Sequence, residues 1–363
     1  MDEIELSHPA VTVDITKRFV WVLESAVNER WFLERVDPDS LEVVGRPIRA
    51  GSPLVSDMAI GGGSAWLSMP TLTAPSWDTE PGIIRRIDLD TGRVTAQIQV
   101  GHHPGGIVWC DGSVWVSNTV DRSVMRIDPA ANRVVATIGV GDGPDELVCG
   151  FDSVWVSNEF QRPVLMRIDP TRDRVVARFP DFIRPVVGDE VLWTIGPGGP
   201  EGAVVPIDPR TNDVGDPIAP LDIGPGYVAA GQGTMWLGKW YDEPSPPPCP
   251  PDADCPFFGT FEFFRMNPTT GETFGDRIVT NGPTTAVVGD GAFWAPLQGM
   301  KLLLHRALDE RHGPANTIDL TDGSFAALSV SGCSKMIVPR AGFAEGVQGR
   351  GSEAAPPLSA RQV

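Results

Sequence analysis

Eight polar residues stand near the ends of predicted strands, and their side chains could bind a ligand or take part in chemistry. They are Glu24, His102, His103, Asn118, Asp145, Glu146, Asn158 and Glu159. Imidazole nitrogens and carboxylate or amide oxygens are ligands that Ca²⁺, Mg²⁺ and Zn²⁺ take from proteins. If these residues converge, they predict a ligand site whose candidate cofactor is one of these divalent metals. The residues themselves fix no cofactor and no catalytic role.

A structural explanation stands beside each of these residues. Asn118 and Asn158 close the two SVWVSN segments, and Ser-Asn at a strand end is typical of turns in which the side chain bonds nearby backbone. The pair His102 and His103 is typical of a solvated loop, and the acidic pair of the GPDE segment is typical of an acidic surface. The sequence contains no G-x-S-x-G, H-E-x-x-H or C-x-x-C motif. These observations favour a protein that binds over one that catalyses.

The elements that must position these residues form a repeat. Residues 101–141 contain four short runs rich in Val, Ile and Trp, at residues 106–110, 113–117, 124–127 and 133–140. Their alternation of apolar and polar residues fits half-buried strands. Asp-Gly after the first run predicts a tight hairpin, and Asp-Pro after the third predicts a type I turn. The stretch therefore predicts a four-stranded antiparallel meander.

The Trp of the second run recurs along the chain, mostly 38 to 49 residues apart. Its seven copies are Trp21, Trp66, Trp115, Trp155, Trp193, Trp236 and Trp294. A four-stranded repeat of this period is typical of a β-propeller, in which radial packing buries both faces of each sheet. We predict an all-β fold, a β-propeller of seven four-stranded antiparallel blades, with eight blades as the alternative.

The two ends of the chain bear on this count. Residues 324–338 begin like an eighth first strand without its Trp, and they would join the two ends of the ring if they paired with the N-terminal segment. Residues 1–338 are predicted to form a single propeller domain. Residues 339–363 lack a strand pattern and are rich in Gly, Pro, Ala and Arg, so we expect a disordered C-terminal tail.

A propeller would bring the eight polar residues together. The loops that enter its first strands and those that follow its second strands surround one mouth of the central channel, and the eight residues fall in these loops. Two long connections after second strands, residues 69–82 and 240–260, would project from the same face. The second connection carries aromatic residues suited to a partner contact, namely Trp240, Tyr241, Phe257 and Phe258. A tolerated insertion without a role is the alternative.

The third strands end in a repeated Arg-x-Asp pattern that we interpret as structural. The aspartates are Asp37, Asp88, Asp128, Asp169 and Asp208, and four of them follow Arg35, Arg86, Arg126 and Arg167. Asp at such a turn accepts backbone N–H bonds, and Arg can bridge to a neighbouring blade. A single active site would not need the same pair in every repeat.

Charge and cysteine content limit the partners and the compartment. The formal net charge is −18, which repels nucleic acid and anionic membranes, so we expect neither as a partner, and we expect a monomer. Cys110 and Cys149 are predicted as small buried core residues, whereas Cys249 and Cys255 could pair. The N-terminus has no signal-peptide pattern, which predicts a cytoplasmic protein as written and leaves an extracytoplasmic location open.

The unit SVWVSN…RIDP…RVVATI resembles the repeats of the YncE-like (YVTN) propeller family and of virginiamycin B lyase-like and NHL-type propellers, over about residues 8–338. The resemblance implies the propeller fold, which hosts binding proteins, scaffolds and a few enzymes. The metal-dependent lyases of this type use histidines and a glutamate near the axis, but their motifs do not align with this chain, so no catalytic residue is carried over. We predict a non-catalytic module that binds a small molecule or protein on one face of the disc. The alternative is a metal-assisted lyase or lactonase-type hydrolase at the channel mouth.

Overall fold

The SVWVSN repeat folds as an antiparallel meander of four strands. These are β10 (Pro104–Cys110), β11 (Ser113–Asn118), β12 (Ser123–Asp128) and β13 (Arg133–Gly139), in this order across the sheet. Asp111 and Gly112 join the first two strands, and both adopt a positive φ, as a two-residue hairpin turn requires. The meander predicted for residues 101–141 is confirmed.

The computed structural model describes residues 2–16, 18–26, 30–51, 54–71, 80–141, 143–159, 162–198, 202–220, 227–231, 234–242, 259–267, 270–281, 287–289, 292–297, 301–305 and 317–319. The regular elements within these residues are all β-strands, so the predicted all-β class is confirmed.

Four further sheets of the described chain have four strands in sequence order. The first contains β2 (Ala10–Ile15), β3 (Val20–Ala26), β4 (Arg30–Val36) and β5 (Ile48–Gly51). The second contains β6 (Asp57–Gly61), β7 (Ser64–Met69), β8 (Pro81–Asp88) and β9 (Arg93–His102). After the β10–β13 sheet come β14 (Pro144–Gly150), β15 (Ser153–Asn158), β16 (Val164–Asp169) and β17 (Arg174–Pro180). The next contains β18 (Ile183–Val187), β19 (Leu192–Gly196), β20 (Ala203–Ile207) and β21 (Ala219–Pro220).

The last two sheets depart from this simple order. One contains β22 (Tyr227–Gly231), β23 (Thr234–Asp242), β24 (Gly259–Met266) and β25 (Thr273–Asn281), and β29 (Thr317–Asp319) adds a fifth, parallel strand beside β25. The other contains β26 (Val287–Gly289), β27 (Ala292–Leu297) and β28 (Lys301–His305), and the N-terminal β1 (Asp2–Glu5) pairs with β28 as its fourth strand.

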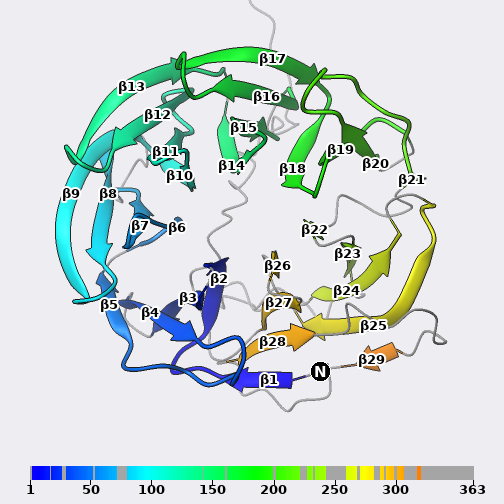
Figure 1. Ribbon diagram of the computed structural model, residues 1–363, viewed down its shortest axis with the longest axis horizontal. Coiled ribbons are helices and arrows are strands. Elements are labelled where there is room, and N and C mark those ends of the chain that lie inside the picture. The colour runs from blue at the N-terminus through cyan, green and yellow to red at the C-terminus, as the bar shows by residue number, and fades with distance from the viewer. Residues whose placement is uncertain are drawn as a thin grey trace, which may run out of the picture.

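The described chain therefore has six four-stranded sheets and one five-stranded sheet. Seven four-stranded blades were predicted, but the described residues contain six, because β29 adds a fifth strand to the β22–β25 sheet. Figure 1 shows the sheets standing side by side around a ring, with the first strand of each nearest the centre. The ring closes through β1 and β28, whereas residues 324–338 and the predicted tail at 339–363 lie outside the described residues.

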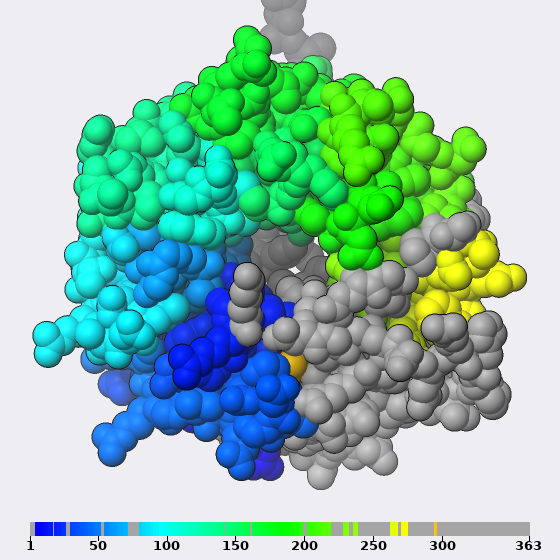
Figure 2. Space-filling view, viewed as in Figure 1, coloured from blue at the N-terminus to red at the C-terminus, as the bar shows by residue number. Residues whose placement is uncertain are grey.

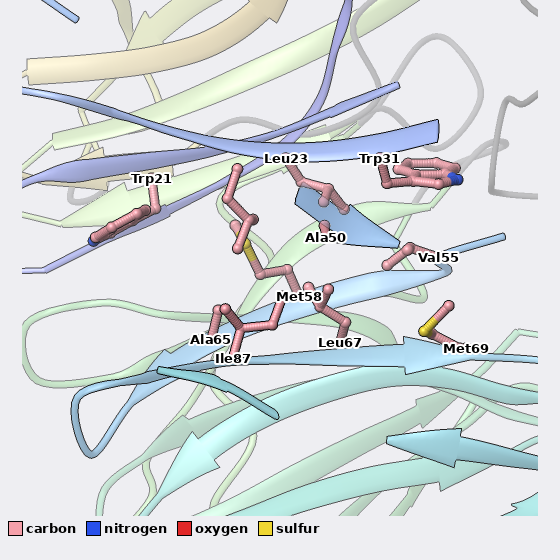
Figure 3. Packing of buried hydrophobic residues seen from close by; sticks show 11 residues of the cluster. Trp21, Leu23, Trp31, Ala50, Val55, Met58, Ala65, Leu67, Met69 and Ile87 are labelled. Atoms are coloured by element: carbon pink, nitrogen blue, oxygen red, sulfur yellow. The ribbon is translucent and has the colours of Figure 1, made fainter. Parts of the chain in front are cut away.

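The recurring Trp residues form the core between neighbouring sheets. All seven lie on the second strand of their sheet, and none exposes more than 8% of its surface. Figure 3 shows one such layer, a buried cluster that includes Trp21 and Leu23 of β3, Leu67 of β7 and Ile87 of β8. Fully burying a side chain such as Leu stabilises the fold by about 1.5–3 kcal/mol, so layers of this kind hold the ring together.

Three of the repeated Arg residues, Arg86, Arg126 and Arg167, tie their sheet to the next. Arg86 stands opposite Trp66 in the β7–β8 pairing and places its guanidinium 4.7 Å from the centre of the indole ring. Arg126, opposite Trp115, forms an ion pair of 2.8 Å with Asp173 of the following sheet. The predicted bridge from Arg to an acidic group of a neighbouring blade is thus confirmed at Arg126.

The repeated Asp residues fold the turns after the third strands, as predicted. Asp128 accepts a bond of 2.8 Å from the backbone N–H of Ala130, and Asp169 accepts one of 2.9 Å from that of Thr171. At Asp88 the hydroxyl and the backbone N–H of Thr91 donate to the carboxylate, and these bonds lower the pKa of Asp88 below its usual value.

A disulfide joins two neighbouring sheets. Cys110, at the end of β10, is bonded to Cys149 of β14, and the sequence separation is 39 residues. The prediction that these two cysteines are separate core thiols was wrong, because the ends of the adjacent first strands bring their Cα atoms within 5.4 Å of each other. Cys249 and Cys255, for which a pairing was predicted, lie outside the described residues.

Candidate functional site

Strand pairing brings the ends of the first and second strands together at one edge of each sheet. Pro104 at the start of β10 pairs with Asn118 at the end of β11, and Pro144 pairs with Asn158 in the same way. Ala10 of β2 likewise pairs with Glu24 of β3. The loops that enter the first strands therefore lie beside the ends of the second strands, as the propeller prediction requires.

The first strands surround the centre of the ring and are bonded to one another. The carboxylate of Asp57 on β6 accepts a bond of 3.2 Å from the backbone N–H of Ile107 on β10, and that of Asp14 on β2 accepts one of 2.7 Å from Ile60 on β6. Figure 2 shows a hollow at the centre of the disc, bordered by the blue, cyan and green sheets. We define the channel mouth as the loops and strand ends on the side of Asn118 and Asn158.

His102 belongs to a cluster between the β6–β9 and β10–β13 sheets. Its Nδ1 atom lies 2.9 Å from Asp121 Oδ1, and its backbone N–H donates to Asp121 Oδ2. Asn118 is fully buried, and its Oδ1 accepts a bond of 2.9 Å from the backbone N–H of Gly101. The cluster therefore leaves the His102–Asp121 pair, about one-third exposed, as its accessible part.

A second group of oxygens surrounds Gly105, where the β10–β13 and β14–β17 sheets meet. Ser117 Oγ donates to the backbone oxygen of Asp145 at 2.8 Å, and Thr119 Oγ1 donates to that of Pro144 at 2.9 Å. A Cβ atom at Gly105 would lie 3.3 Å from Asp145 Oδ1 and 3.2 Å from Ser117 Oγ. The absence of a side chain at Gly105 lets the two sheets approach closely here.

A third cluster contains Glu159, which follows β15, and Arg184 of β18. The guanidinium binds the carboxylate through two bonds, Nε to Oε1 at 3.0 Å and Nη2 to Oε2 at 3.2 Å. Each side chain exposes 21% of its surface. A two-point pair of this kind fixes both side chains in orientation.

Glu24 is a predicted site residue that the structure buries completely. Its Oε2 lies 3.1 Å from His8 Nδ1, and its carboxyl also bonds that of Glu34, which in turn accepts bonds from the backbone N–H and hydroxyl of Ser7. Burial and the neighbouring Glu34 carboxyl raise the pKa of Glu24 to about 10. At pH 7 the Glu24 carboxyl is thus protonated, and it contacts His8 of the N-terminal segment.

The remaining predicted residues take different places. His103 adopts a φ of 52°, and its carbonyl accepts a bond from the backbone N–H of Thr119. Glu146 follows Asp145 on β14 and is partly buried, and Asn158 is 2% exposed at the end of β15. Each of these two residues has at least one interaction with the rest of the protein.

The long connection at residues 240–260 is built partly of strand. Trp240 and Tyr241 belong to β23, where they pair with Phe261 and Thr260 of β24. The prediction of a loop over these positions was therefore wrong at its two ends, because the hairpin is longer than its counterparts. Residues 243–258, with Phe257 and Phe258, lie outside the described part, as do residues 72–79 of the other long connection.

Within the described residues, no three His, Cys, Asp or Glu side chains are grouped so that they could hold one metal ion. The polar side chains of the mouth instead form pairs and hydrogen-bonded clusters. Among them, the His102–Asp121 and Glu159–Arg184 pairs are partly exposed and can exchange hydrogen bonds and charge interactions with a ligand.

Sequence reasoning missed the partners in these clusters, namely Asp121, Arg184, His8 and Glu34. Asp121 had one available signal, since it stands three residues after Asn118 in the loop after the second strand. Arg184 had none, because it lies inside β18, a strand of the next sheet.

The chain matches no protein-family model, and no curated protein is similar to it in sequence. Solved structures nevertheless share its fold. A chain of Kuenenia stuttgartiensis hydrazine synthase is 12% identical, with a TM-score of 0.60, over 84% of this chain and 97% of that one. The computationally designed Ika8 protein is 9% identical, with a TM-score of 0.54, over 83% of this chain and 98% of that one. At these identities the likeness concerns the fold alone.

These comparisons leave the resemblance to YncE-like propellers as a prediction. No helix in the described ranges is long and apolar enough to cross a membrane.

Proposed function

We propose that this protein is a non-catalytic binding module that takes a small molecule or a protein at the channel mouth. The region of contact is formed by the partly exposed members of the eight predicted site residues, whereas the buried Glu24 and Asn118 support it from beneath. The β23–β24 hairpin is a neighbouring contact surface. Nucleic acid and anionic membranes remain unfavourable partners because of the net charge of −18.

The pairing of the mouth's polar side chains is the observation that supports this proposal. Arg184 is bound to Glu159 through two hydrogen bonds, and His102 is held by Asp121. Such pairs present fixed donors and charges at little further cost in side-chain entropy, which suits recognition. A metal-dependent lyase or lactonase would need at least three ligands around one ion.

Metal analysis of the purified protein tests the proposal against this alternative. We expect less than stoichiometric Ca, Mg and Zn by elemental mass spectrometry, and a melting temperature that chelator leaves unchanged. Stoichiometric metal that is lost in both His102→Ala and Glu159→Ala would overturn the proposal in favour of the enzyme.

A ligand screen tests directly whether the protein binds a small molecule. A panel of small metabolites would be ranked by the shift each causes in melting temperature, and the best compound titrated by calorimetry. We expect Arg184→Ala to weaken its binding about tenfold or more, because a charged hydrogen bond contributes about 1.5–3 kcal/mol. Arg172→Ala is the matched control, since Arg172 is an exposed Arg that pairs with Asp169 in a turn after a third strand. Equal binding to wild type and Arg184→Ala would place the ligand elsewhere.

The contribution of the hairpin is tested by replacing residues 243–258 with Asn-Gly. The pairing of Asp242 with Gly259 is then closed by a two-residue turn. We expect the free energy of unfolding to stay level or to rise by up to about 2 kcal/mol, because a shorter loop costs less entropy to close. A fall in stability would mean that residues 243–258 pack structurally and are no independent contact surface.

An oxidising compartment fits the disulfide better than the cytoplasm does, because disulfides persist mainly where thiols are not kept reduced. We propose such a location for this protein. Alkylation of thiols in intact cells, followed by mass spectrometry of the Cys110 and Cys149 peptides, distinguishes the two compartments.

A further inference from the structure

Three neighbouring sheet junctions share one contact on the face opposite the channel mouth. Arg86 donates to the carbonyl of Pro129 at 2.6 Å and to Asn132 Oδ1 at 2.9 Å. Arg167 makes the same contact with Pro209 and Asn212 of the next sheet. At the junction between these two, Arg126 binds Asp173 Oδ2 at 2.8 Å. The Arg of each sheet thus meets a side-chain oxygen on the third-strand turn of the following sheet.

The junction between the β2–β5 and β6–β9 sheets lacks this oxygen. Arg35 stands opposite Trp21 as Arg86 stands opposite Trp66. The position of Asn132, Asp173 and Asn212 is taken here by Gly92, which has no side chain to accept the bond. Arg35 instead donates from Nε to the carbonyl of Val44 in its own sheet, at 3.1 Å.

A cavity of about 160 Å³ lies where the contact is missing. Its wall contains the apolar side chains of Trp21, Leu33, Ile48 and Leu89, together with Arg35 and Arg46. The turn at residues 90–92 completes it. Trp21 and Leu33 are buried, so the apolar surface that a ligand can touch comes mainly from Ile48 and Leu89. The cavity therefore combines two cationic groups with a small apolar surface, and its volume is close to the roughly 150 Å³ of an apolar cavity that holds one benzene ring.

We propose that this cavity binds a small monocarboxylate that carries one apolar group. The carboxylate occupies the position that the Asp173 carboxylate takes between the β10–β13 and β14–β17 sheets. It accepts hydrogen bonds from Arg35, and Arg46 adds positive charge. The apolar group packs on Ile48 and Leu89. This site is separate from the channel mouth, since it lies at the other end of the strands.

Asp90 is the one acidic residue among the described residues of the cavity wall, and it is exposed on the turn. Its negative charge opposes an anionic ligand and partly offsets the two arginines. Replacing Asp90 with Asn is therefore expected to strengthen the binding of a carboxylate.

The equivalent turns of the other sheets suggest a variant that should fill the site. Gly92 has a φ of 66°, and Asn132, Asp173 and Asn212 adopt 49°, 50° and 65° at the equivalent position, so Asp or Asn is accommodated there. A Cβ atom at Gly92 would meet Ile48 at 3.5 Å, an ordinary contact distance. Gly92→Asp should place a carboxylate against Arg35 and rebuild the missing junction.

Calorimetric titration of the full-length protein with sodium benzoate tests the proposal. We expect benzoate to bind the wild type and to bind Asp90→Asn more tightly, whereas benzyl alcohol, its uncharged analogue, binds about tenfold more weakly or worse. Gly92→Asp is expected to weaken benzoate binding at least about tenfold and to raise the melting temperature. Ala131→Asp, which adds the same charge to the exposed turn of the next sheet, should leave binding unchanged.

Two results would overturn the proposal. One is the absence of benzoate binding to both the wild type and Asp90→Asn. The other is benzoate binding by Gly92→Asp as tight as by the wild type. His102→Ala serves to separate this site from the channel mouth, because its benzoate affinity should equal that of the wild type whether or not the proposed function holds.

Discussion

The buried carboxyl of Glu24 makes the stability of this protein depend on pH. The pKa of Glu24 is raised to about 10 by burial and by the Glu34 carboxyl, from about 4.5 in an unfolded chain. A group whose pKa is higher in the folded state binds its proton more tightly there, so the free energy of unfolding falls as pH rises from about 4.5 towards 10. The slope contributed by one such group is at most about 1.4 kcal/mol per pH unit.

Glu24→Gln tests this directly, because an amide keeps the shape and the donor of the protonated carboxyl but does not titrate. We expect chemical denaturation between pH 5 and 9 to show a clear loss of stability in the wild type and a smaller loss in Glu24→Gln. His8→Phe is a second variant, which removes the contact of His8 Nδ1 with Glu24. A Phe ring can keep the stacking on Phe32, whose ring centroid lies 4.5 Å from that of His8. Parallel pH profiles for wild type and Glu24→Gln would show that Glu24 is ionised in the folded protein.

The pairing of β10 with β14 is reinforced by a covalent bond. The disulfide between Cys110 and Cys149 closes a chain segment of about 39 residues, and the loop-entropy model gives about 4 kcal/mol of stabilisation for such a segment. We expect Cys110→Ser with Cys149→Ser to lower the free energy of unfolding by about 2–4 kcal/mol, and a reducing agent to lower that of the wild type alone.

Equilibrium unfolding with and without reductant measures both effects. Cys333→Ser is the control, since it removes a cysteine that takes no part in this disulfide. An identical effect of reductant on wild type and on the double variant would contradict the assignment of the bond.

The ring as a whole depends on the N-terminal strand. β1 is the outer strand of the sheet that contains β26, β27 and β28, and the chain then continues into β2, the first strand of the next sheet. Ile4 and Leu6 are 5% and 6% exposed, and they pack with Val22 of β3 and Trp294 of β27. The two ends of the ring are thus joined by a short segment with an apolar inner side.

We expect Ile4→Ala to lower the free energy of unfolding by about 2–5 kcal/mol, the usual cost of truncating a buried Ile. Glu5→Ala, at the neighbouring exposed position, should change it by no more than about 0.5 kcal/mol. Thermal unfolding and limited proteolysis measure the difference. Similar stability of the two variants would mean that β1 does not hold the ring closed.

Local pattern in the sequence was enough to predict the four-stranded meander and its repetition. Alternating apolar residues around Trp115 define two faces of β11, and Asp111-Gly112 can form a tight turn whatever surrounds it. These signals act between neighbours in the chain, so they predicted the meander and its repetition. The aspartates of the third-strand turns were interpreted correctly for the same reason, since Asp128 bonds a backbone N–H only two residues away.

Contacts between sheets could not be predicted in this way. Arg184 reaches Glu159 across 25 residues, and Cys110 meets Cys149 only because the first strands of adjacent sheets, β10 and β14, lie side by side. Pairings of this kind depend on how far each sheet is rotated against the next, which no short pattern encodes. The mouth residues were therefore found in the sequence as separate groups, and their partners came from the structure.

The sequence by itself determined that this chain forms radial four-stranded repeats, because Trp, Val and turn residues recur with one period. The tertiary structure alone decided that Glu24 is buried against Glu34, that β1 closes the ring, and that Gly92 leaves a cavity beside Arg35. The physical reason is that a repeat specifies each sheet, whereas burial, charge pairing and vacant space arise only between sheets. The role of Gly92 depends on Arg35, which lines the same cavity from the neighbouring sheet.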